Sequence, residues 1–597
     1  MLSLLVILPF VKEIGRTLML SFDQTRFSES IAVGPALPDS ELPLPRIYAC
    51  ERDTPLQPLF TQPLNGELFH WNWSSAMQEA RRVAAWIQAQ NWPSGSNIAI
   101  LSKNCAWWIM ADFAIWMAGH VSVPLFTSAN DASLSKLIRH SQAVACFVGQ
   151  LDHPLPMGQE AFGSLAYIAF PNCSVENIPQ GSVSWSEIIA KHSPLGGNPQ
   201  RGADEVATII YTSGTTGESK GAMQTFRSMI LMGKSMEPAF GVNPDSGLDR
   251  ILSYLPLAHI AERAIVEMNS LIVPMHIFFS EGLPTFLTDL ARSRCTIFFS
   301  IPRLYIRFQQ SVFEKIHRRK LNLLLAIPVL GRIVRRKIVT NLGLGETRLI
   351  CSGGAAIPVD IIQWYRKLGL NFLEGYGMTE TGITHAPLPG QARLGYVGSA
   401  SPWALTRISP EGEVQIKGPM NMLGYYRNPE LSREAFTEDG FFRTGDRGEI
   451  DSLGRLRLVG RIKDEFKTSK GKYVAPGQIE KLLAVSYLFE SVAVFGDGLT
   501  APFAIAVLAP PLRKKQSNPE DRADIETKLT AELDSVNSKL EHHEQLRFIV
   551  ISEQPWTVDN QLLTPTLKVR RVALEQRLSP RFADWEDSQK KVIWIET

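Results

Sequence analysis

The stretch YTSGTTGESKG, Tyr211 to Gly221, guides the interpretation of this 597-residue chain. It ends the run VATIIYTS (206–213), whose β-branched residues predict a buried strand. Gly214 and Gly217 lack a Cβ, so backbone N–H groups there can approach an anion closely. Lys220 adds a positive charge. Hydroxyl groups that can bond a phosphate or help hold Mg²⁺ come from Thr212, Ser213, Thr215 and Thr216. The stretch predicts a phosphate-binding turn.

This turn does not follow the order of a Walker A loop, G-x-x-x-x-G-K-[ST]. Here Gly217 is followed by Glu218, and Lys220 is followed by Gly221. A flexible surface turn is the alternative interpretation. The position directly behind a β-rich strand favours phosphate binding.

Six more motifs are placed along the chain. They are YLPLAHIAER (254–263), SGGAAIP (352–358), GYGMTE (375–380), FFRTGD (441–446), GRIKD (460–464) and LTPTLKVRR (563–571). With Tyr211–Gly221, this set resembles the signature motifs of the adenylate-forming superfamily, which includes acyl-CoA synthetases, adenylation domains and luciferases. The resemblance extends from about Gly66 to Lys568.

The resemblance implies a nucleotide site. Gly353 and Gly354 match the loop on the adenine side, and Gly375 opens the motif in which Tyr376 stacks on adenine. Further matches are Thr379 at the α-phosphate, Glu380 at magnesium with Thr215, and Asp446 and Arg461 at the ribose. Lys463 matches the hinge position, and softer matches place Lys467 and Tyr473 near the nucleotide. Oxygen ligands such as Glu380 suit a hard cation.

Four residues are candidates for catalysis: Lys568, His259, Thr215 and Glu380. Lys568 matches the mobile catalytic lysine of the family, and His259 matches a histidine that borders the acid and the phosphate. Attack of a carboxylate on the α-phosphate brings two anions together, and an ammonium group stabilises the charge that develops.

The resemblance is closest to long-chain fatty acyl-CoA synthetases. It implies ATP, Mg²⁺ and CoA: a fatty acid first forms an acyl-adenylate, and a thiol then displaces AMP. A carrier-protein thiol in place of CoA, an ATPase releasing ADP, and a nucleotide-binding protein without catalysis are the alternatives. Two departures are QTF (224–226), where a Thr-His pair is usual, and Gly477, where a Glu is usual, although Glu480 is kept. Acyl-chain length, the acyl-pocket residues and the oligomeric state are left open.

The expected fold class is α/β, because short apolar runs alternate with helical patterns. We expect an N-terminal extension (1–65), a large AMP-binding domain (66–462) and a small mobile α/β domain (463–597) that carries the catalytic lysine. The large domain should contain two helix-covered sheets and a β-rich subdomain.

Charge and composition give weaker indications. A net charge of +2 does not suggest a nucleic-acid partner, and six scattered cysteines favour reduced thiols in the cytoplasm. The apolar start MLSLLVILPF fits an interfacial anchor, a packed helix, or an over-long gene start. Basic residues also flank LNLLLAIPVLG: Lys315, Arg318, Arg319, Lys320, Arg332, Arg335, Arg336 and Lys337. They predict peripheral contact with an anionic inner-membrane surface, with a solvated helix face as the alternative.

Overall fold

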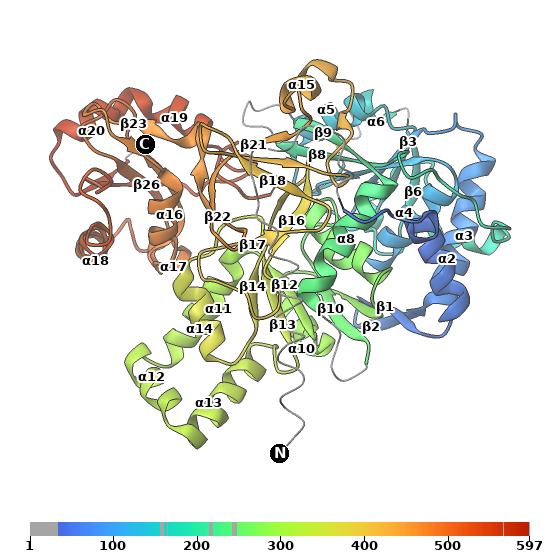
Figure 1. The fold of residues 1–597 in the computed structure, drawn as a ribbon, viewed down its shortest axis with the longest axis horizontal. Helices are drawn as coiled ribbons and strands as arrows, with labels where there is room; N and C mark the ends of the chain where they lie inside the picture. The colour runs from blue at the N-terminus through green and yellow to red at the C-terminus, as the bar shows by residue number, and fades with distance from the viewer. Residues whose placement is uncertain are drawn as a thin grey trace.

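The computed structural model describes residues 34–155, 160–163, 165–213, 219–241, 247–564 and 566–595. Three large sheets and their helices form most of the molecule, and a smaller α/β unit packs at one end (Figure 1). The expected fold class is confirmed. The apolar N-terminus of the sequence lies outside the described residues.

An eight-stranded sheet carries the glycine-rich stretch, in the order β20-β9-β8-β4-β3-β5-β6-β7. β3, β4, β5 and β6 are parallel and lie next to the antiparallel pair β8–β9. The strands are β3 (Asn97–Leu101), β4 (Val121–Leu125), β5 (Ala145–Val148), β6 (Ala166–Ala169), β7 (Val183–Ser184), β8 (Val206–Ser213), β9 (Ser219–Thr225) and β20 (Gly424–Tyr425).

A seven-stranded sheet has the order β14-β13-β12-β10-β11-β1-β2. Its strands are β1 (Pro58–Leu64), β2 (Glu67–Asn72), β10 (Asp249–Ser253), β11 (Met275–Phe279), β12 (Ile297–Ser300), β13 (Leu349–Ser352) and β14 (Phe372–Glu374). β1 pairs in parallel with β11, and its residues 59–63 are buried. The expected N-terminal extension (1–65) therefore reaches too far along the chain, because β1 is an inner strand of the large domain.

A seven-stranded antiparallel sheet, β15-β16-β17-β22-β21-β19-β18, is the expected β-rich subdomain. Its strands are β15 (Tyr376–Met378), β16 (Gly382–Ala386), β17 (Gly398–Ala400), β18 (Leu405–Ile408), β19 (Glu413–Lys417), β21 (Phe442–Ile450) and β22 (Arg455–Arg461). GYGMTE contains the edge strand β15, FFRTGD opens β21, and GRIKD begins at the end of the adjacent strand β22 and continues beyond it.

Helices cover the two mainly parallel sheets, which are the eight-stranded sheet and the seven-stranded sheet that contains β1 (Figure 1). The apolar α4 has every residue buried between β3 and β4. The helices of this part are α2 (Pro43–Asp53), α3 (Trp73–Ala89), α4 (Ala106–Met117), α5 (Asp131–Ser141), α6 (Glu160–Gly163), α7 (Trp185–Lys191), α8 (Phe226–Phe240), α9 (Ile260–Glu262), α10 (Phe286–Ser293), α11 (Pro302–Lys315), α12 (Arg318–Ala326), α13 (Pro328–Asn341), α14 (Val359–Lys367) and α15 (Pro429–Ala435).

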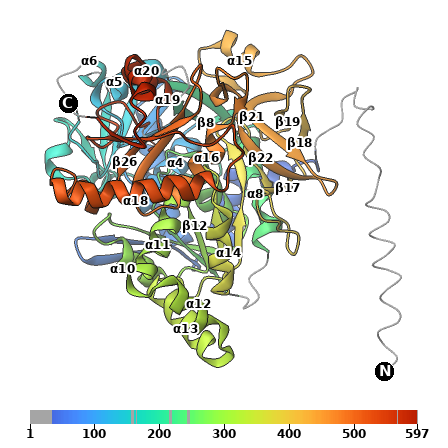
Figure 2. The ribbon, with the colours of Figure 1, turned by 90° about the vertical axis from the view of Figure 1, so that its left-hand side faces the viewer.

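The C-terminal unit has its own core around the sheet β25-β26-β27-β28. The 3-10 helix η4 (Ile462–Asp464) connects it to β22, and the expected hinge residue Lys463 lies in η4. Its elements are β23 (Phe466–Lys467), β24 (Tyr473–Val474), α16 (Pro476–Ala484), β25 (Phe489–Phe495), β26 (Phe503–Leu508), α17 (Pro510–Arg513), α18 (Pro519–Asn537), β27 (Ile549–Ser552), α19 (Arg571–Leu578), α20 (Phe582–Asp587) and β28 (Val592–Trp594). Figure 2 shows α18 crossing the outer face of this unit.

A charged cluster is fully buried where α4 meets the π-helix η3 (Arg263–Met268). The Arg263 guanidinium pairs with Asp112 and with Glu267, the latter at 2.8 Å, and donates to the Thr208 hydroxyl at 2.7 Å. Burial raises the pKa of Glu267 well above its ordinary value, although Arg263 opposes the shift. Burial raises the pKa of Asp112 as well, and one guanidinium cannot neutralise two buried carboxylates, so the two carboxyl groups share one proton.

Replacing Arg263 is expected to destabilise the large domain strongly. Arg263→Met leaves the Asp112 carboxylate buried without its cation, and removing one partner of a buried pair costs about 3–5 kcal/mol. Urea unfolding followed by tryptophan fluorescence measures the change. Arg52→Met is the matched control, since the Arg52–Asp53 pair is on the surface and its loss should leave the midpoint unchanged. Equal midpoints for both variants would show that the buried cluster contributes no stability.

Among the described residues, no helix combines the length and the apolar character that a membrane crossing needs.

Candidate active site

The glycine-rich stretch lies at the end of the β8–β9 hairpin. Thr212 pairs with Lys220 across the two strands, and Ser213 pairs with Ser219. The predicted loop residues Gly214, Thr215, Thr216 and Gly217 lie outside the described residues. The strand pairing still brings the side chain of Lys220 to the same end of the sheet as the loop. Its ammonium nitrogen lies 5.4 Å from the centre of the Tyr425 ring.

Three residues of the predicted nucleotide site form one contact cluster. The Tyr376 hydroxyl donates to an Asp446 oxygen at 2.6 Å, and Arg461 Nε lies 2.8 Å from the other oxygen. Asp446 and Arg461 face each other on the paired strands β21 and β22. Burial raises the pKa of Asp446, whereas Arg461 and Tyr376 lower it. The carboxylate keeps lone pairs that can accept further hydrogen bonds.

The predicted adenine loop lies beside this cluster. The Gly375 N–H donates to the Ser352 carbonyl at 3.0 Å, so SGGAAIP and GYGMTE start next to each other. Gly354 has φ +76°, a conformation that favours glycine. A Cβ on Gly353 would lie 3.6 Å from the Gly375 carbonyl, at ordinary contact distance. The two motifs therefore form one continuous backbone surface next to Tyr376.

A second cluster contains the predicted magnesium ligand. Glu380 is buried, and its Oε1 accepts a hydrogen bond from the Tyr425 hydroxyl at 3.0 Å. The Met422 N–H also donates to the Glu380 carbonyl at 2.7 Å. Tyr425 belongs to β20, which pairs with β9, so it links Glu380 to the strand that carries Lys220. Sequence reasoning missed Tyr425, whose only signal is an aromatic pair in GYYRN.

We expect Tyr425 to position Glu380. In Tyr425→Phe the ring beside Lys220 remains, but the hydrogen bond to the carboxylate is lost. A hydrogen bond to a charged group is worth about 1.5–3 kcal/mol, so kcat/KM for ATP should fall about 10-fold or more. The Mg²⁺ concentration for half-maximal activity should rise as well.

Tyr426→Phe is the matched control for this prediction. The Tyr426 hydroxyl accepts from Asn97 at 3.1 Å, on the side of the sheet away from Glu380. Its loss should leave the magnesium dependence unchanged. If both variants shift that dependence equally, the effect comes from packing and not from Glu380.

His259, in the middle of the YLPLAHIAER motif, caps the start of α9. Its Nδ1 accepts from the Ala261 N–H at 3.2 Å, which assigns the hydrogen of the neutral ring to Nε2. Burial and the nearby Lys568 lower the pKa of His259 to about 4. The ring is therefore neutral near pH 7 and offers an N–H donor. Glu262 fixes this turn, accepting from the Ser253 hydroxyl at 2.8 Å and from the Tyr254 N–H at 3.1 Å.

The catalytic-lysine motif forms a tight turn in the C-terminal unit. The Thr564 N–H donates to the Lys568 carbonyl at 2.8 Å, and the Lys568 N–H donates to the Thr564 hydroxyl at 3.1 Å. Leu567, between them, has φ +60°, which is unfavourable for a branched side chain. This turn directs Lys568 away from the core of its own unit.

Lys568 faces the clusters on the large domain. Its ammonium group interacts electrostatically with Asp446, Glu380 and Arg461, and it lowers the pKa of His259. Loss of water on the side of the ammonium group that faces these residues, together with the positive charge of Arg461, lowers the pKa of Lys568, and the two carboxylates oppose this. Its side chain is nevertheless accessible to solvent. Residues from four separate motifs are thus within electrostatic range of one lysine of the other unit.

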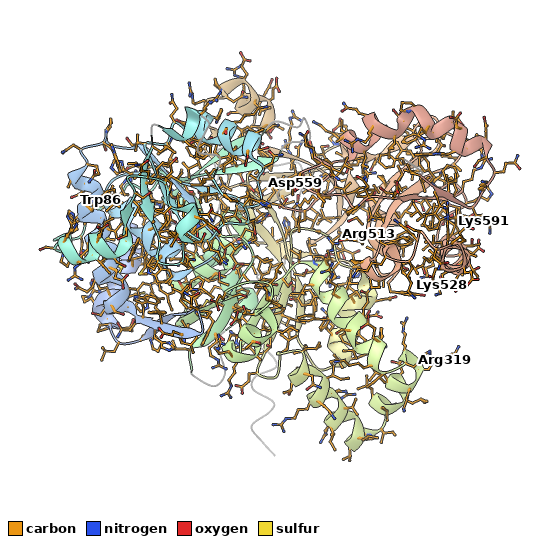
Figure 3. The ribbon with its side chains drawn as sticks, turned by 180° about the vertical axis from the view of Figure 1, so that it is seen from behind. Trp86, Arg319, Arg513, Lys528, Asp559 and Lys591 are labelled. Carbon is orange, nitrogen blue, oxygen red and sulfur yellow. The ribbon has the colours of Figure 1, made fainter. Side chains whose placement is uncertain are left out.

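Polar contacts hold the C-terminal unit in this pose. Arg303 of α11 pairs with Glu490 of β25 at 3.2 Å, and Arg513 (labelled in Figure 3) pairs with the same carboxylate at 2.6 Å. Across the same junction, burial raises the pKa of Glu374 to about 7, and Lys481 of α16 opposes the shift. These contacts explain how Lys568 reaches residues more than 100 positions earlier in the chain.

Three predicted residues are placed less directly. Lys467 and Tyr473 face each other on β23 and β24, with the ammonium nitrogen 5.5 Å from the ring centre. Thr379 is buried, and its carbonyl accepts from the Gln224 side chain at 2.6 Å. The sequence analysis noted Gln224 only as part of a departure from the family pattern. It connects β9 to the GYGMTE loop.

The other departures are accommodated by packing. Phe226, where a histidine is usual, lies in the core with its ring centre 5.5 Å from that of Trp116. Gly477 has open space around its Cβ position. Glu480 accepts from the Val494 N–H at 2.7 Å and pairs with Arg571, so it braces the turn that carries Lys568.

Comparison with known proteins shows the family to which the chain belongs. The family model of AMP-binding enzymes matches residues 52–426. The chain belongs to this family of adenylate-forming enzymes, and it is close to the long-chain acyl-CoA synthetases.

Two relatives illustrate this similarity. The peroxisomal long chain acyl-CoA synthetase 6 of Arabidopsis thaliana is 29% identical over 543 residues, or 80% of this chain and 76% of the relative. The long-chain-fatty-acid–CoA ligase FadD15 of Mycobacterium tuberculosis is 28% identical over 581 residues, or 89% of this chain and 95% of the relative.

Solved structures show the same fold. The A domain of the carboxylic acid reductase from Segniliparus rugosus, in complex with AMP and a co-purified carboxylic acid, has a TM-score of 0.75 at 20% identity. It covers 94% of this chain and 97% of that chain. ATP-bound MatB from Rhodopseudomonas palustris has a TM-score of 0.68 at 23% identity and covers 91% and 99% of the two chains.

Proposed function

We propose that this enzyme activates a fatty acid with ATP as an acyl-adenylate and transfers the acyl group to CoA. The observation that carries the proposal is the convergence of Lys568, Asp446, Glu380 and His259 from both units. The names of the relatives support a long-chain acid. A cytoplasmic enzyme that meets its acid at a membrane surface fits this activity.

In the first half-reaction, a carboxylate oxygen attacks the α-phosphorus and pyrophosphate leaves. Lys568 offsets the repulsion between the two anions and stabilises the charge that develops. Asp446, held by Tyr376 and Arg461, accepts the ribose hydroxyls, and the loops at Gly353 and Gly375 contact the adenine. The neutral His259 donates from Nε2 to an oxygen of the reacting carboxyl or phosphate group.

In the second half-reaction, the thiol sulfur attacks the acyl carbon and AMP leaves. This step needs no lysine at the α-phosphate. We propose that the small domain begins near Lys463 and turns there, which withdraws Lys568 between the two steps. The contacts of Glu490 with Arg303 would break in that motion.

The residues present suit magnesium. Glu380 is a buried carboxylate with one oxygen held by Tyr425, so the other oxygen can serve as a hard ligand. The predicted second ligand, Thr215, lies outside the described residues. When bound, the ion neutralises phosphate charge. Lys220 provides a further positive charge beside the same tyrosine.

An acid panel tests the proposal. The purified chain is incubated with ATP, Mg²⁺ and acids from acetate to oleate, and AMP, ADP and thioester are measured with and without CoA. We expect AMP and acyl-CoA, with the highest kcat/KM for long acids. ADP as product indicates a phosphotransferase, AMP without CoA consumption indicates a carrier-protein thiol, and no turnover with any acid contradicts the proposal.

A further inference from the structure

Helices α12 and α13 form a hairpin that projects from the large domain (Figures 1 and 2). The two helices join at Ile327, and the first turn of α13 packs against the end of α12. A Cβ on Gly331 would meet the Leu325 carbonyl oxygen at 2.7 Å. Leu321 and Ile338 are buried on the inner side. The hairpin is therefore an ordered, packed element, and its outer end is free of the body.

Aliphatic side chains gather at the end of the hairpin. Five of the 21 exposed large hydrophobic side chains of the described residues fall between positions 323 and 333. We call these five the hairpin tip: Leu323, Ile327, Val329, Leu330 and Ile333. Val329 is 73% exposed and Leu323 71%. Single exposed aliphatic residues are common on protein surfaces, but a cluster of them indicates an interaction site.

Two basic clusters flank the hairpin tip. We define them as Lys315–Lys320 and Arg332–Lys337, and together they contain eight Lys and Arg residues. Residues 315–345 contain no Asp or Glu, although the whole chain has a net charge of only +2. Arg319 extends from the hairpin in Figure 3. Within the described part of the chain, none of the eight forms an ion pair. The charge is therefore concentrated here and is not neutralised locally.

We propose that the α12–α13 hairpin docks the enzyme on an anionic lipid bilayer. The hairpin tip enters the interfacial layer, and the basic clusters contact the headgroup phosphates. An apolar end with cations set back from it is the arrangement that interfacial helices use. Two other partners fit less well. A second copy would bring two sets of eight like charges together, and a nucleic acid offers no apolar surface to the aliphatic tip.

This inference is independent of the acid that the site activates. Docking is measured without ATP, CoA or acid, by sedimentation of the full chain with phosphatidylcholine vesicles that contain or lack phosphatidylglycerol. We expect binding only to the anionic vesicles, and weaker binding as salt rises. Failure of the acid panel would leave vesicle binding unaffected, and failure of vesicle binding would leave the result of the acid panel unaffected.

Two variants separate the two parts of the surface. Val329→Ser with Ile333→Ser removes apolar contacts and should weaken binding about tenfold per side chain. Arg332→Gln, Arg336→Gln and Lys337→Gln together should weaken it about 100-fold and flatten the salt dependence. Both variants should keep the native thermal transition and the native rate with the best water-soluble acid of the panel, since neither changes the site.

Matched controls carry the same substitutions on other faces. Val175→Ser with Leu453→Ser removes exposed aliphatic side chains, and Lys514→Gln, Lys539→Gln and Lys590→Gln remove exposed cations. Neither control should change vesicle binding. The proposal is wrong if the native chain does not bind anionic vesicles, or if controls and hairpin variants lose binding equally. It is also wrong if the tip substitutions instead abolish self-association in lipid-free solution.

Discussion

Lys568→Ala is expected to abolish adenylate formation and to spare thioester formation from a supplied acyl-adenylate. The lysine faces Asp446 and Glu380 from the other unit, where the carboxylate of the acid and the α-phosphate would meet. Removing one preorganised charge-stabilising donor costs about 10²–10³-fold in rate, and a full positive charge should cost at least as much. Pyrophosphate release measures the first step, and CoA consumption with prepared oleoyl-adenylate measures the second.

The control for this prediction is Lys470→Ala. Lys470 is exposed in the turn between β23 and β24 of the same small unit, and its loss should leave both half-reactions unchanged. Equal losses of the two half-reactions in Lys568→Ala would contradict the assigned role. They would indicate that the turn at Thr564–Lys568 supports the whole site and does not serve the first step alone.

Much of the large domain could be predicted because its strands are local patterns. The run from Asn97 to Leu125 is one of the places where short apolar runs alternate with a helical pattern, and it forms β3, α4 and β4. VATIIYTS coincides with β8. These segments are short, apolar and ended by Gly, Pro or polar residues, so each carries its own signal.

Other features could not be predicted because they depend on distant pairing. Phe60 of β1 pairs with Ile277 of β11, and no periodicity near Phe60 indicates a partner so far along the chain. The role of Tyr425 arises in the same way, because β20 meets β9 across about half of the large domain. Phe60 was therefore placed in the N-terminal extension, and Tyr425 was left out of the predicted site.

The candidate site shows the same division. The motifs that hold Tyr376, Glu380 and Asp446 could be identified from their order along the chain. Their mutual placement depends on the antiparallel sheet, in which Asp446 and Arg461 are paired across β21 and β22. The approach of Lys568 depends further on the docking of two separately packed units, which involves contacts such as Arg303–Glu490. A motif identifies which residue is present, whereas contacts between distant strands and between the two units determine which groups that residue faces.

Asp446→Asn is expected to weaken both half-reactions, in contrast to Lys568→Ala. The ribose is present in ATP and in the acyl-adenylate, so a residue that binds it acts in both steps. Two charge-assisted hydrogen bonds are weakened when the carboxylate becomes an amide, which should raise KM for ATP about 100-fold or more. The affinity for supplied acyl-adenylate should fall by a similar factor, with a smaller change in kcat.

The physical basis of this contrast is the anchoring of Asp446. Tyr376 at 2.6 Å and Arg461 at 2.8 Å fix the carboxylate, so the asparagine occupies the same place with one acceptor oxygen instead of two. Asp439→Asn is the matched control, because Asp439 pairs with Arg407 on the exposed side of the same subdomain. Its kinetics should remain native. If Asp446→Asn impaired only the ATP step, Asp446 would be acting on the triphosphate and not on the ribose, and the nucleotide would have to lie differently across β21 and β22.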